Sequence, residues 1–208
     1  MSKPIYLFSA TPNPDVIHIN SLDFKFFQPD IDFSKYNFLI LTSKKAVEAL
    51  SFYDKKDYID IPALCISEFT KNYYESVGGK VIGVGGGIGS DLLPIIKSYA
   101  KDKKWLYLRA KEIAGDGFNV DEVIVYESEC SSEILNFRLN DEECVLIFTS
   151  PSSVRCFLKN NIITSKNKII VIGKTTANSL PAYVKYTMPK INSIKECLKL
   201  ANLLIIEI

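Results

Sequence analysis

Leu39-Ile40-Leu41-Thr42-Ser43 returns as Leu146-Ile147-Phe148-Thr149-Ser150, an offset of 107 positions (from 42 to 149). A second pair, Thr70 and Thr176, continues the repeat at an offset of 106. The shared Thr-Ser stands where an apolar strand gives way to a helical pattern, which chance produces less readily than apolar strands alone. A period of this length is too long for a solenoid and fits two copies of one α/β domain. We therefore predict an internal duplication.

Strand-like and helix-like patterns alternate along most of the chain. Short connections between them predict an α/β fold of two similar domains, each a parallel sheet covered by helices. The predicted strands are Ile5–Ser9, Val16–Ile19, Leu22–Phe26, Phe38–Leu41, Ala63–Ile66, Val81–Val84, Trp105–Leu108, Val123–Tyr126, Val145–Phe148, Ile169–Ile172 and one near Tyr186. The predicted helices are Lys44–Tyr53, Phe69–Val77, one from Ser90, one from Ser150, Thr175–Leu180 and Ser193–Leu203.

The first repeat begins only after a segment that predicts strands and no helix. That segment must complete a sheet elsewhere, most simply in the second repeat. The prediction is a discontinuous domain of residues 1–22 and 130–208 and a second domain of residues 28–122. The chain then crosses between domains through residues 22–28 and 123–130. Two crossings make a hinge, and the groove beside a hinge is a natural ligand site.

The composition is that of an ordered globular protein. Of 208 residues, 47% are hydrophobic and 24% charged, and the formal net charge is +1. This balance argues against a nucleic-acid or membrane binder, which usually carries a basic excess. The apolar run Ile5–Ala10 is too short for a signal sequence, and no run reaches the roughly 18 residues of a membrane span. We expect a soluble, cytoplasmic protein.

The cysteines and the single histidine indicate no reactive centre. A zinc site needs three or four clustered ligands, and the spacing provides none, so we predict no metal. His18 lies in an apolar stretch with no nucleophile motif nearby, which argues against a catalytic triad. The number of cysteines is odd and no two form a Cys-x-x-Cys pair, so we interpret them as buried reduced thiols. They are Cys65, Cys130, Cys144, Cys156 and Cys197.

Hydroxyl side chains follow the two repeated strands. In a parallel α/β sheet, ligands bind beyond the carboxyl ends of the strands, against helix N-termini. Thr42, Ser43, Thr149 and Ser150 stand at such ends, where free N–H groups can take a carboxylate or phosphate. Each of these hydroxyls can alternatively be a plain helix cap with no ligand. Each nearby cation can alternatively be a solvated surface residue. These cations are Lys44, Lys45, Arg155 and Lys174.

The glycine-rich run Gly83–Ser90 does not fit a nucleotide-binding motif. Read from Gly83, the pattern G-x-G-x-x-G ends on Ile88, and read from Gly85 it ends on Ser90. No lysine completes a P-loop either. We interpret the run as a flexible turn between a strand and a helix.

Four blocks of sequence resemble uroporphyrinogen-III synthases, in the family's order. Phe38–Leu50 resembles the first block, a strand followed by (T/S)-S-x-x-A-V, and Val123–Tyr126 resembles the strand that ends in a near-invariant tyrosine. Leu146–Arg155 resembles the third block, F-(T/S)-S-P-S-x-V, and Val171–Ala177 the fourth, I-G-x-x-T-A. Singly each block is weak, but together they are fairly specific and cover most of the chain from Tyr36 onward.

The resemblance implies two α/β domains joined by a two-stranded antiparallel ladder. It implies conversion of hydroxymethylbilane, a linear tetrapyrrole with eight carboxylates, into uroporphyrinogen III. The terminal hydroxyl leaves as water, and the ring closes with ring D inverted through a spiro intermediate. The reaction needs no metal or other cofactor. Because the bilane closes unaided to the uninverted isomer, the enzyme must bias its geometry. The resemblance also suggests a monomer, with transient contact with hydroxymethylbilane synthase as a further expectation.

The resemblance also implies site residues. Tyr126 is expected to assist loss of the hydroxyl as a proton donor, and a hinge tyrosine that only packs is the alternative. Thr70 and Thr176 match the family's cleft threonine in the two repeats. The expected substrate contacts are Thr42, Ser43, Lys44, Thr70, Arg109, Thr149, Ser150, Lys174, Thr175 and Thr176.

The sequence departs from the family pattern at two helices. Thr11–Asp15 replaces the helix after the first strand, and the helix after Arg109 is cut short around Gly115–Asn119. These departures bear on substrate contacts near Ser9 and Arg109 more than on the fold. The competing function is a non-catalytic, two-lobed binding module for a small anionic ligand, similar to periplasmic solute receptors. The missing export signal and the block order count against it.

Overall fold

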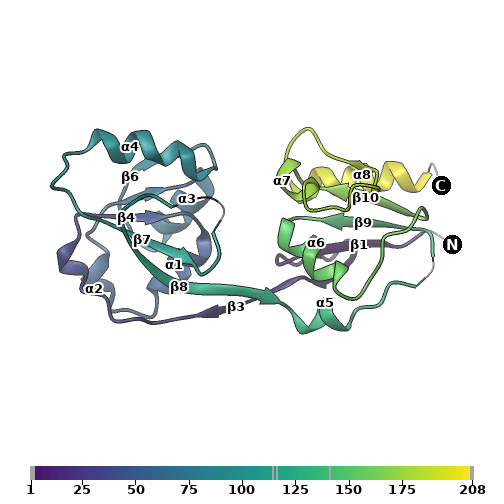
Figure 1. Cartoon of the computed structure of the whole chain (residues 1–208), viewed down its shortest axis with the longest axis horizontal. Helices are drawn as coiled ribbons and strands as arrows, with labels where there is room; N and C mark the ends of the chain where they lie inside the picture. The colour runs from purple at the N-terminus through teal and green to yellow at the C-terminus, as the bar shows by residue number, and fades with distance from the viewer. Residues whose placement is uncertain (1–2, 114, 116, 141, 207–208) are drawn as a thin grey trace. The chain divides into compact units, whose positions relative to one another are not determined.

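The chain forms two compact units, each with its own sheet. The structure is a computed structural model that describes residues 3–113, 115, 117–140 and 142–206. Unit 1 contains the chain up to Asp23 and from Glu129 onward, and unit 2 is Phe24–Ser128. Both sheets are covered by helices (Figure 1). The predicted α/β fold with mainly parallel sheets is confirmed.

The sheet of unit 1 has the order β11-β10-β9-β1-β2, and its neighbouring strands are parallel. β1, from the N-terminal segment, lies between β2 and β9. The strands are β1 (Ile5–Ser9), β2 (Ile17–Asn20), β9 (Cys144–Phe148), β10 (Asn167–Val171) and β11 (Tyr186–Thr187). The helices are α5 (Ser132–Asn136), α6 (Pro151–Leu158), α7 (Lys174–Ala177) and α8 (Ile194–Ile206).

Helices cover both faces of this sheet, because successive strand residues point to opposite faces. On one face, Phe8 packs against Phe148 and against Phe157 of α6, with ring centroids 5.0 and 4.9 Å apart. On the other face, Leu7 packs in a cluster with Cys197 of α8. Strands buried on both faces explain the uninterrupted apolar runs in the sequence.

The sheet of unit 2 has the order β3-β8-β7-β4-β5-β6, and β8, β7, β4, β5 and β6 run parallel to one another. The strands are β3 (Leu22–Phe26), β4 (Phe38–Leu41), β5 (Ala63–Cys65), β6 (Val81–Val84), β7 (Trp105–Ala110) and β8 (Asp121–Cys130). The helices are η1 (Phe33–Lys35), α1 (Lys44–Leu50), α2 (Lys55–Tyr58), α3 (Glu68–Ser76), η2 (Gly89–Leu92) and α4 (Leu93–Ser98).

β3 and β8 carry the chain between the units and lie side by side (Figure 1). The Phe27 N–H donates to the Val125 carbonyl at 2.9 Å, and the Ser131 N–H donates to the Ser21 carbonyl at 3.3 Å. Residue numbers rise along one segment as they fall along the other, so the two segments run in opposite directions. Each strand also contributes to both cores: β3 through Leu22 in unit 1 and Phe24 in unit 2, and β8 through Cys130 and Val125 respectively.

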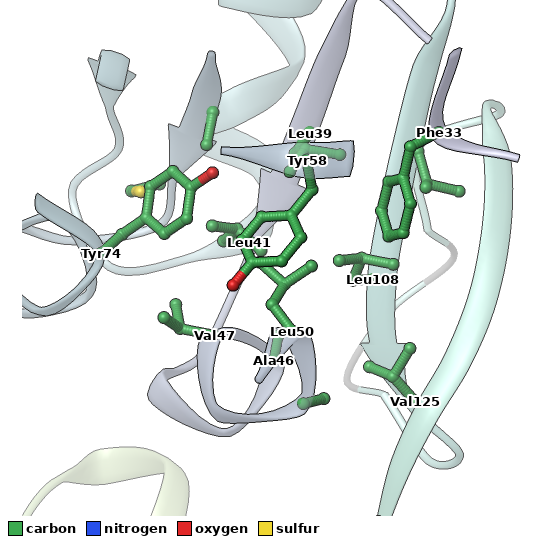
Figure 2. Packing of buried hydrophobic residues seen from close by; sticks show 14 of the residues in the cluster. Phe33, Leu39, Leu41, Ala46, Val47, Leu50, Tyr58, Tyr74, Leu108 and Val125 are labelled. Carbon is green, nitrogen blue, oxygen red and sulfur yellow. The ribbon is translucent and has the colours of Figure 1, made fainter. Parts of the chain in front are cut away.

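The larger core of unit 2 lies between its sheet and the helices α1, α2 and α3. Figure 2 shows Leu41 of β4 among Val47 of α1, Tyr58 of α2 and Tyr74 of α3. Tyr74 is completely buried, and its phenol oxygen has no hydrogen-bond partner among the described residues. The opposite face packs Ile40 and neighbouring strand residues against the segment of η2 and α4.

Two predicted helices are shorter in the structure. α1 ends at Leu50 because the next residues turn, with the Tyr53 N–H donating to the Leu50 carbonyl at 3.0 Å, and Asp54 then caps α2. α7 ends at Ala177, where the Ser179 N–H donates to the Thr176 carbonyl at 3.0 Å. Sequence periodicity missed α2 and α5, which span four and five residues and complete too few turns to show a period.

The interpretation of all five cysteines as reduced thiols is wrong for one pair. Cys130, at the end of β8, and Cys156 of α6 form a disulfide with a Cα–Cα distance of 5.5 Å. Cys65, Cys144 and Cys197 are free and buried. The bonded pair is 26 positions apart without a spacing motif, so only the packing of α6 beside the end of β8 brings the sulfurs together.

Candidate functional site

The junction between β4 and α1 carries the first group of predicted site residues. Ser43 has extended backbone angles, and its hydroxyl caps α1 by accepting a hydrogen bond from the Ala46 N–H at 3.1 Å. The same Ser43 oxygen lies 2.8 Å from the phenol oxygen of Tyr126. Ser43 is therefore a helix cap and also a direct partner of the predicted catalytic tyrosine.

Tyr126 lies on β8 at the edge of the unit 2 core. Its side chain is 9% exposed and neighbours the rings of Phe24 and Phe26, with centroids 6.3 and 6.4 Å away. Burial raises the pKa of Tyr126, and the hydrogen bond with Ser43 acts in the opposite direction. The phenol is therefore protonated at neutral pH and can donate a proton.

A second tyrosine, which sequence reasoning missed, meets the other hydroxyl of this junction. The phenol oxygen of Tyr107 on β7 lies 3.0 Å from Oγ1 of Thr42. Burial raises the pKa of Tyr107, and the bond with Thr42 partly offsets the rise. The Tyr107 ring packs edge-on against Phe118 at 4.8 Å. The sequence did contain a signal for Tyr107: it is a polar side chain near the carboxyl end of a predicted strand, and that strand neighbours β4.

Arg109 also follows this end of β7, but its guanidinium is already occupied. Nε lies 2.7 Å from Oε2 of Glu122, although the angle does not meet hydrogen-bond geometry. Nη1 donates to the carbonyls of Ala110 at 2.9 Å and Lys111 at 3.1 Å. The arrangement gives Arg109 a structural role at the turn that leads out of β7. A direct contact with substrate stays a prediction.

Lys44 and Thr70 complete the residues predicted in unit 2. The ammonium of Lys44 lies 4.4 Å from the ring centroid of Tyr73 and 3.6 Å from a carboxylate oxygen of Glu48. Thr70 is buried inside the first turn of α3, and its hydroxyl lies 3.3 Å from that of Ser67, which caps α3. The residue at the turn after β5 is therefore Ser67, with Thr70 directly behind it.

The equivalent junction of unit 1 lies between β9 and α6. Ser150 and Ser153 form a reciprocal capping box, with each side chain accepting from the other's backbone N–H at 3.0 and 3.2 Å. The hydroxyl of Thr149 donates to the Phe8 carbonyl of β1 at 3.1 Å, which leaves its lone pairs as acceptors. Both interpretations of these hydroxyls, helix cap and ligand contact, therefore remain compatible with the geometry.

The turn after β10 in unit 1 carries the remaining predicted residues. Gly173 is the N-cap of α7, and no side chain caps that helix. A side chain at Gly173 would approach Nδ2 of Asn192 to 3.0 Å, which favours glycine here. Lys174 and Thr175 are exposed, whereas Thr176 is buried. Because β9 and β10 are adjacent and parallel, the junctions that begin at Thr149 and Gly173 lie at the same edge of the sheet.

The glycine-rich turn after β6 is occupied by a side chain of the protein. A carboxylate oxygen of Asp91 accepts a hydrogen bond from the Gly86 N–H at 3.0 Å. A carboxylate at this place excludes a phosphate from the same amide, which supports the interpretation of the run as an ordinary turn. In unit 1, Nε2 of the single histidine of the sequence, His18, lies 2.9 Å from the Ser9 carbonyl oxygen.

The described part of the chain offers neither a metal site nor a membrane span. Within residues 3–113, 115, 117–140 and 142–206, no three histidine, cysteine or acidic side chains gather in a group that could hold a metal ion. In the same part of the chain, no helix has the length and apolar character needed to cross a bilayer.

Comparison with known proteins shows which proteins share this fold. Solved structures include uroporphyrinogen-III synthetase from Helicobacter pylori 26695, with 27% identity, a TM-score of 0.82, and coverage of 97% of this chain and 99% of that chain. A mutant uroporphyrinogen III synthase from the extremely thermophilic bacterium Thermus thermophilus shares the fold at 13% identity and a TM-score of 0.61, covering 98% of this chain and 100% of that one. Comparison with curated proteins gave no match.

The family comparison covers most of the chain. The model described as uroporphyrinogen-III synthase HemD matches residues 15–195. This stretch contains both strand-to-helix junctions, Tyr126 and the turn at Gly173. The non-catalytic binding module raised as an alternative is not favoured by these matches. The chain belongs to the uroporphyrinogen-III synthase HemD family.

Proposed function

We propose that this protein converts hydroxymethylbilane into uroporphyrinogen III. The observation that carries the proposal is the contact between Tyr126 and Ser43 at a strand-to-helix junction, in a chain whose family model spans residues 15–195. A buried, protonated phenol supplies the acid that loss of a hydroxyl requires. No metal or other cofactor takes part in the proposed reaction.

The chemistry of the first step follows from a chain of hydrogen-bond donors. The Ala46 N–H donates to Ser43 Oγ, which lies 2.8 Å from the Tyr126 oxygen. In the proposed step the Ser43 hydroxyl is the donor of this second bond, which frees the phenol proton for the substrate. As the substrate's carbon–oxygen bond breaks, that proton passes to the leaving hydroxyl, which departs as water. The donors and the N-terminus of α1 stabilise the phenolate that forms, until a later deprotonation of the substrate restores the phenol.

The remaining site residues hold the substrate's carboxylates. We assign this role in unit 1 to Thr149, Ser150, Lys174, Thr175 and Thr176, and in unit 2 to Thr42, Lys44, Thr70 and Arg109. Lys174 and Thr175 are exposed, and the turn before them lacks a side-chain cap, which leaves backbone N–H groups for an anion. Thr42 contributes through Tyr107, its hydrogen-bonded partner.

Three further features belong to this proposal. The enzyme has two domains, one made of residues 1–22 and 130–208 and the other of residues 28–122. The segments 22–28 and 123–130 form the hinge between them. The protein acts as a monomer in the cytoplasm, which sedimentation and cell fractionation test. It makes transient contact with hydroxymethylbilane synthase, because an unstable bilane is best delivered directly, and kinetic competition with free bilane tests that contact.

The decisive experiment measures the isomer formed. Hydroxymethylbilane is generated freshly in the presence and absence of the purified protein, and the oxidised products are separated by chromatography. The expected result is a shift from the type I to the type III isomer that increases with protein concentration. If the folded protein leaves only type I product, the proposed activity is excluded.

A further inference from the structure

A hollow on unit 1 is lined by none of the residues assigned to the substrate site above. Its volume is about 530 Å³, and it is formed by the first residues of β10, by the segment Tyr183–Thr187 and by Leu204 of α8. A volume of this size is within the range of small-molecule sites, which span roughly 300–1,000 Å³. The proposed substrate contacts follow the other end of β10. Four positions separate Ile169, at the hollow, from Gly173, at the proposed substrate site. At the usual rise of a strand this is a distance of about 13 Å.

The walls of this hollow combine apolar surface with aromatic rings. Ile163 and Ile169 are buried below it, and Val184 and Leu204 are partly buried. Tyr183 and Tyr186 are 68% and 49% exposed, so their rings are accessible to a ligand. Rings and aliphatic side chains arranged in this way suit a flat, apolar body.

Among the described residues, the charged side chains that line the hollow have one sign. They are Lys168 and Lys185, and no described lining residue is acidic. Outside the hollow, Lys168 acts on the carboxyl group of Glu143, whose pKa is lowered mainly by Lys3 and less by Lys166 and Lys168. Within the described chain, no carboxylate is paired with Lys185. Two ammonium groups without lining carboxylates favour an anion.

We propose that this hollow binds a small planar aromatic molecule that carries one or two carboxylates. The ring lies against Tyr183, Tyr186 and Ile169, and the carboxylate meets Lys168 and Lys185. A volume of about 530 Å³ suits a ligand with a single aromatic unit. The inference does not depend on the proposed catalytic activity.

The test uses the full chain and two probes of equal shape. Indole-3-acetate is the anion, and indole-3-acetamide is its neutral counterpart, with binding followed by calorimetry and ligand-observed NMR. We expect saturable binding of the acetate and about five-fold weaker binding of the amide, as two partly exposed charge contacts provide. No saturable binding to folded protein up to about 10 mM overturns the proposal, as does equal binding of both probes.

Variants locate the probe. Lys185→Ala and Lys168→Ala should each weaken the acetate about three-fold, and Tyr186→Ala about five-fold. Lys195→Ala, an exposed lysine near the beginning of α8, is the matched control and should change nothing. Thermal unfolding confirms that each variant is folded. An equal loss in Lys195→Ala, or a loss in Lys174→Ala with none in Lys185→Ala, overturns the assignment to this hollow. The isomer assay is a separate experiment, so failure here leaves the proposed synthase activity standing.

Discussion

The phenol oxygen of Tyr126 and Oγ of Ser43 lie 2.8 Å apart, although 83 positions separate them in sequence. Ser43 holds this place because its oxygen also accepts the Ala46 N–H and so fixes the first turn of α1. The tyrosine is thereby connected to a helix N-terminus through a single hydroxyl. This relationship underlies the proposed role of Tyr126 as a proton donor, which the variants below test.

Removing the phenol oxygen should slow catalysis without unfolding the protein. For Tyr126→Phe we expect kcat to fall about ten- to a hundred-fold, near the lower range for loss of a general acid. The ring and its packing against Phe24 are retained, so the thermal midpoint should change little. Isomer analysis and steady-state kinetics measure the effect. An unchanged kcat would show that Tyr126 only packs.

The same tyrosine predicts a pH dependence. Because burial raises the pKa of Tyr126 above its ordinary value, the proton-donating form persists at neutral and mildly alkaline pH. Wild-type kcat should therefore hold until the pH rises through that raised pKa and then fall. The decline should be absent from the residual activity of Tyr126→Phe. Circular dichroism at each pH separates this effect from alkaline unfolding.

Ser43 has two roles, which a matched variant separates. Ser43→Ala and Ser67→Ala each remove a helix cap, so each should lower the free energy of unfolding by about 1 kcal/mol. Only Ser43 also contacts Tyr126, so only its loss should lower kcat further, about ten-fold for one hydrogen bond to the acid. Equal kinetic effects in both variants would mean that Ser43 acts solely as a cap.

Tyr74 predicts a stabilising substitution. Its phenol oxygen is buried with no hydrogen-bond partner among the described residues, so Tyr74→Phe should raise the free energy of unfolding by about 1–2 kcal/mol. Denaturant titration at pH 7 measures this gain. Tyr53→Phe is the contrasting control, because the Tyr53 hydroxyl donates to the Pro29 carbonyl at 2.8 Å. Its removal should lower the free energy of unfolding. A destabilised Tyr74→Phe would reveal a partner for that oxygen.

The gain from Tyr74→Phe should increase at alkaline pH. Burial raises the pKa of Tyr74 in the folded protein, whereas an unfolded tyrosine ionises near about 10. As the pH rises above that value, the unfolded chain loses protons that the folded chain keeps, so stability falls. The variant lacks this contribution. Tyr6, whose pKa is raised to about 12 mainly by burial, should retain its own share of the decline in both proteins.

The disulfide between Cys130 and Cys156 should contribute measurably to stability. It closes a loop across 26 positions, and the chain-entropy estimate for a loop of this length is about 3.5 kcal/mol. A reductant should lower the unfolding midpoint of the wild type and leave that of the Cys130→Ser, Cys156→Ser double variant unchanged. Equal sensitivity in both proteins would mean that loss of the Cys130–Cys156 disulfide does not cause the change in the midpoint.

Much of the fold can be predicted from local sequence. Strands such as Ile5–Ser9 and Phe38–Leu41 were predicted with the bounds they have in the structure, because a buried parallel strand is a continuous apolar run bounded by polar residues. Capping side chains marked the starts of α1 and α6 for the same local reason. The repeated Thr-Ser junctions indicated the duplication because copies of one domain keep the residues at which its helices begin.

Other features depend on contacts between distant parts of the chain. No local pattern links Tyr107 to Thr42, Cys130 to Cys156 or Arg109 to Glu122, because each pair meets only when separate strands and helices pack together. The length of α1 likewise depends on the turn at Tyr53 and the cap at Asp54. Local sequence thus establishes which elements form and where they begin, since backbone preferences and burial periodicity act over a few residues. Packing alone establishes which side chains meet, because hydrogen bonds and disulfides require atoms within a few ångströms of one another.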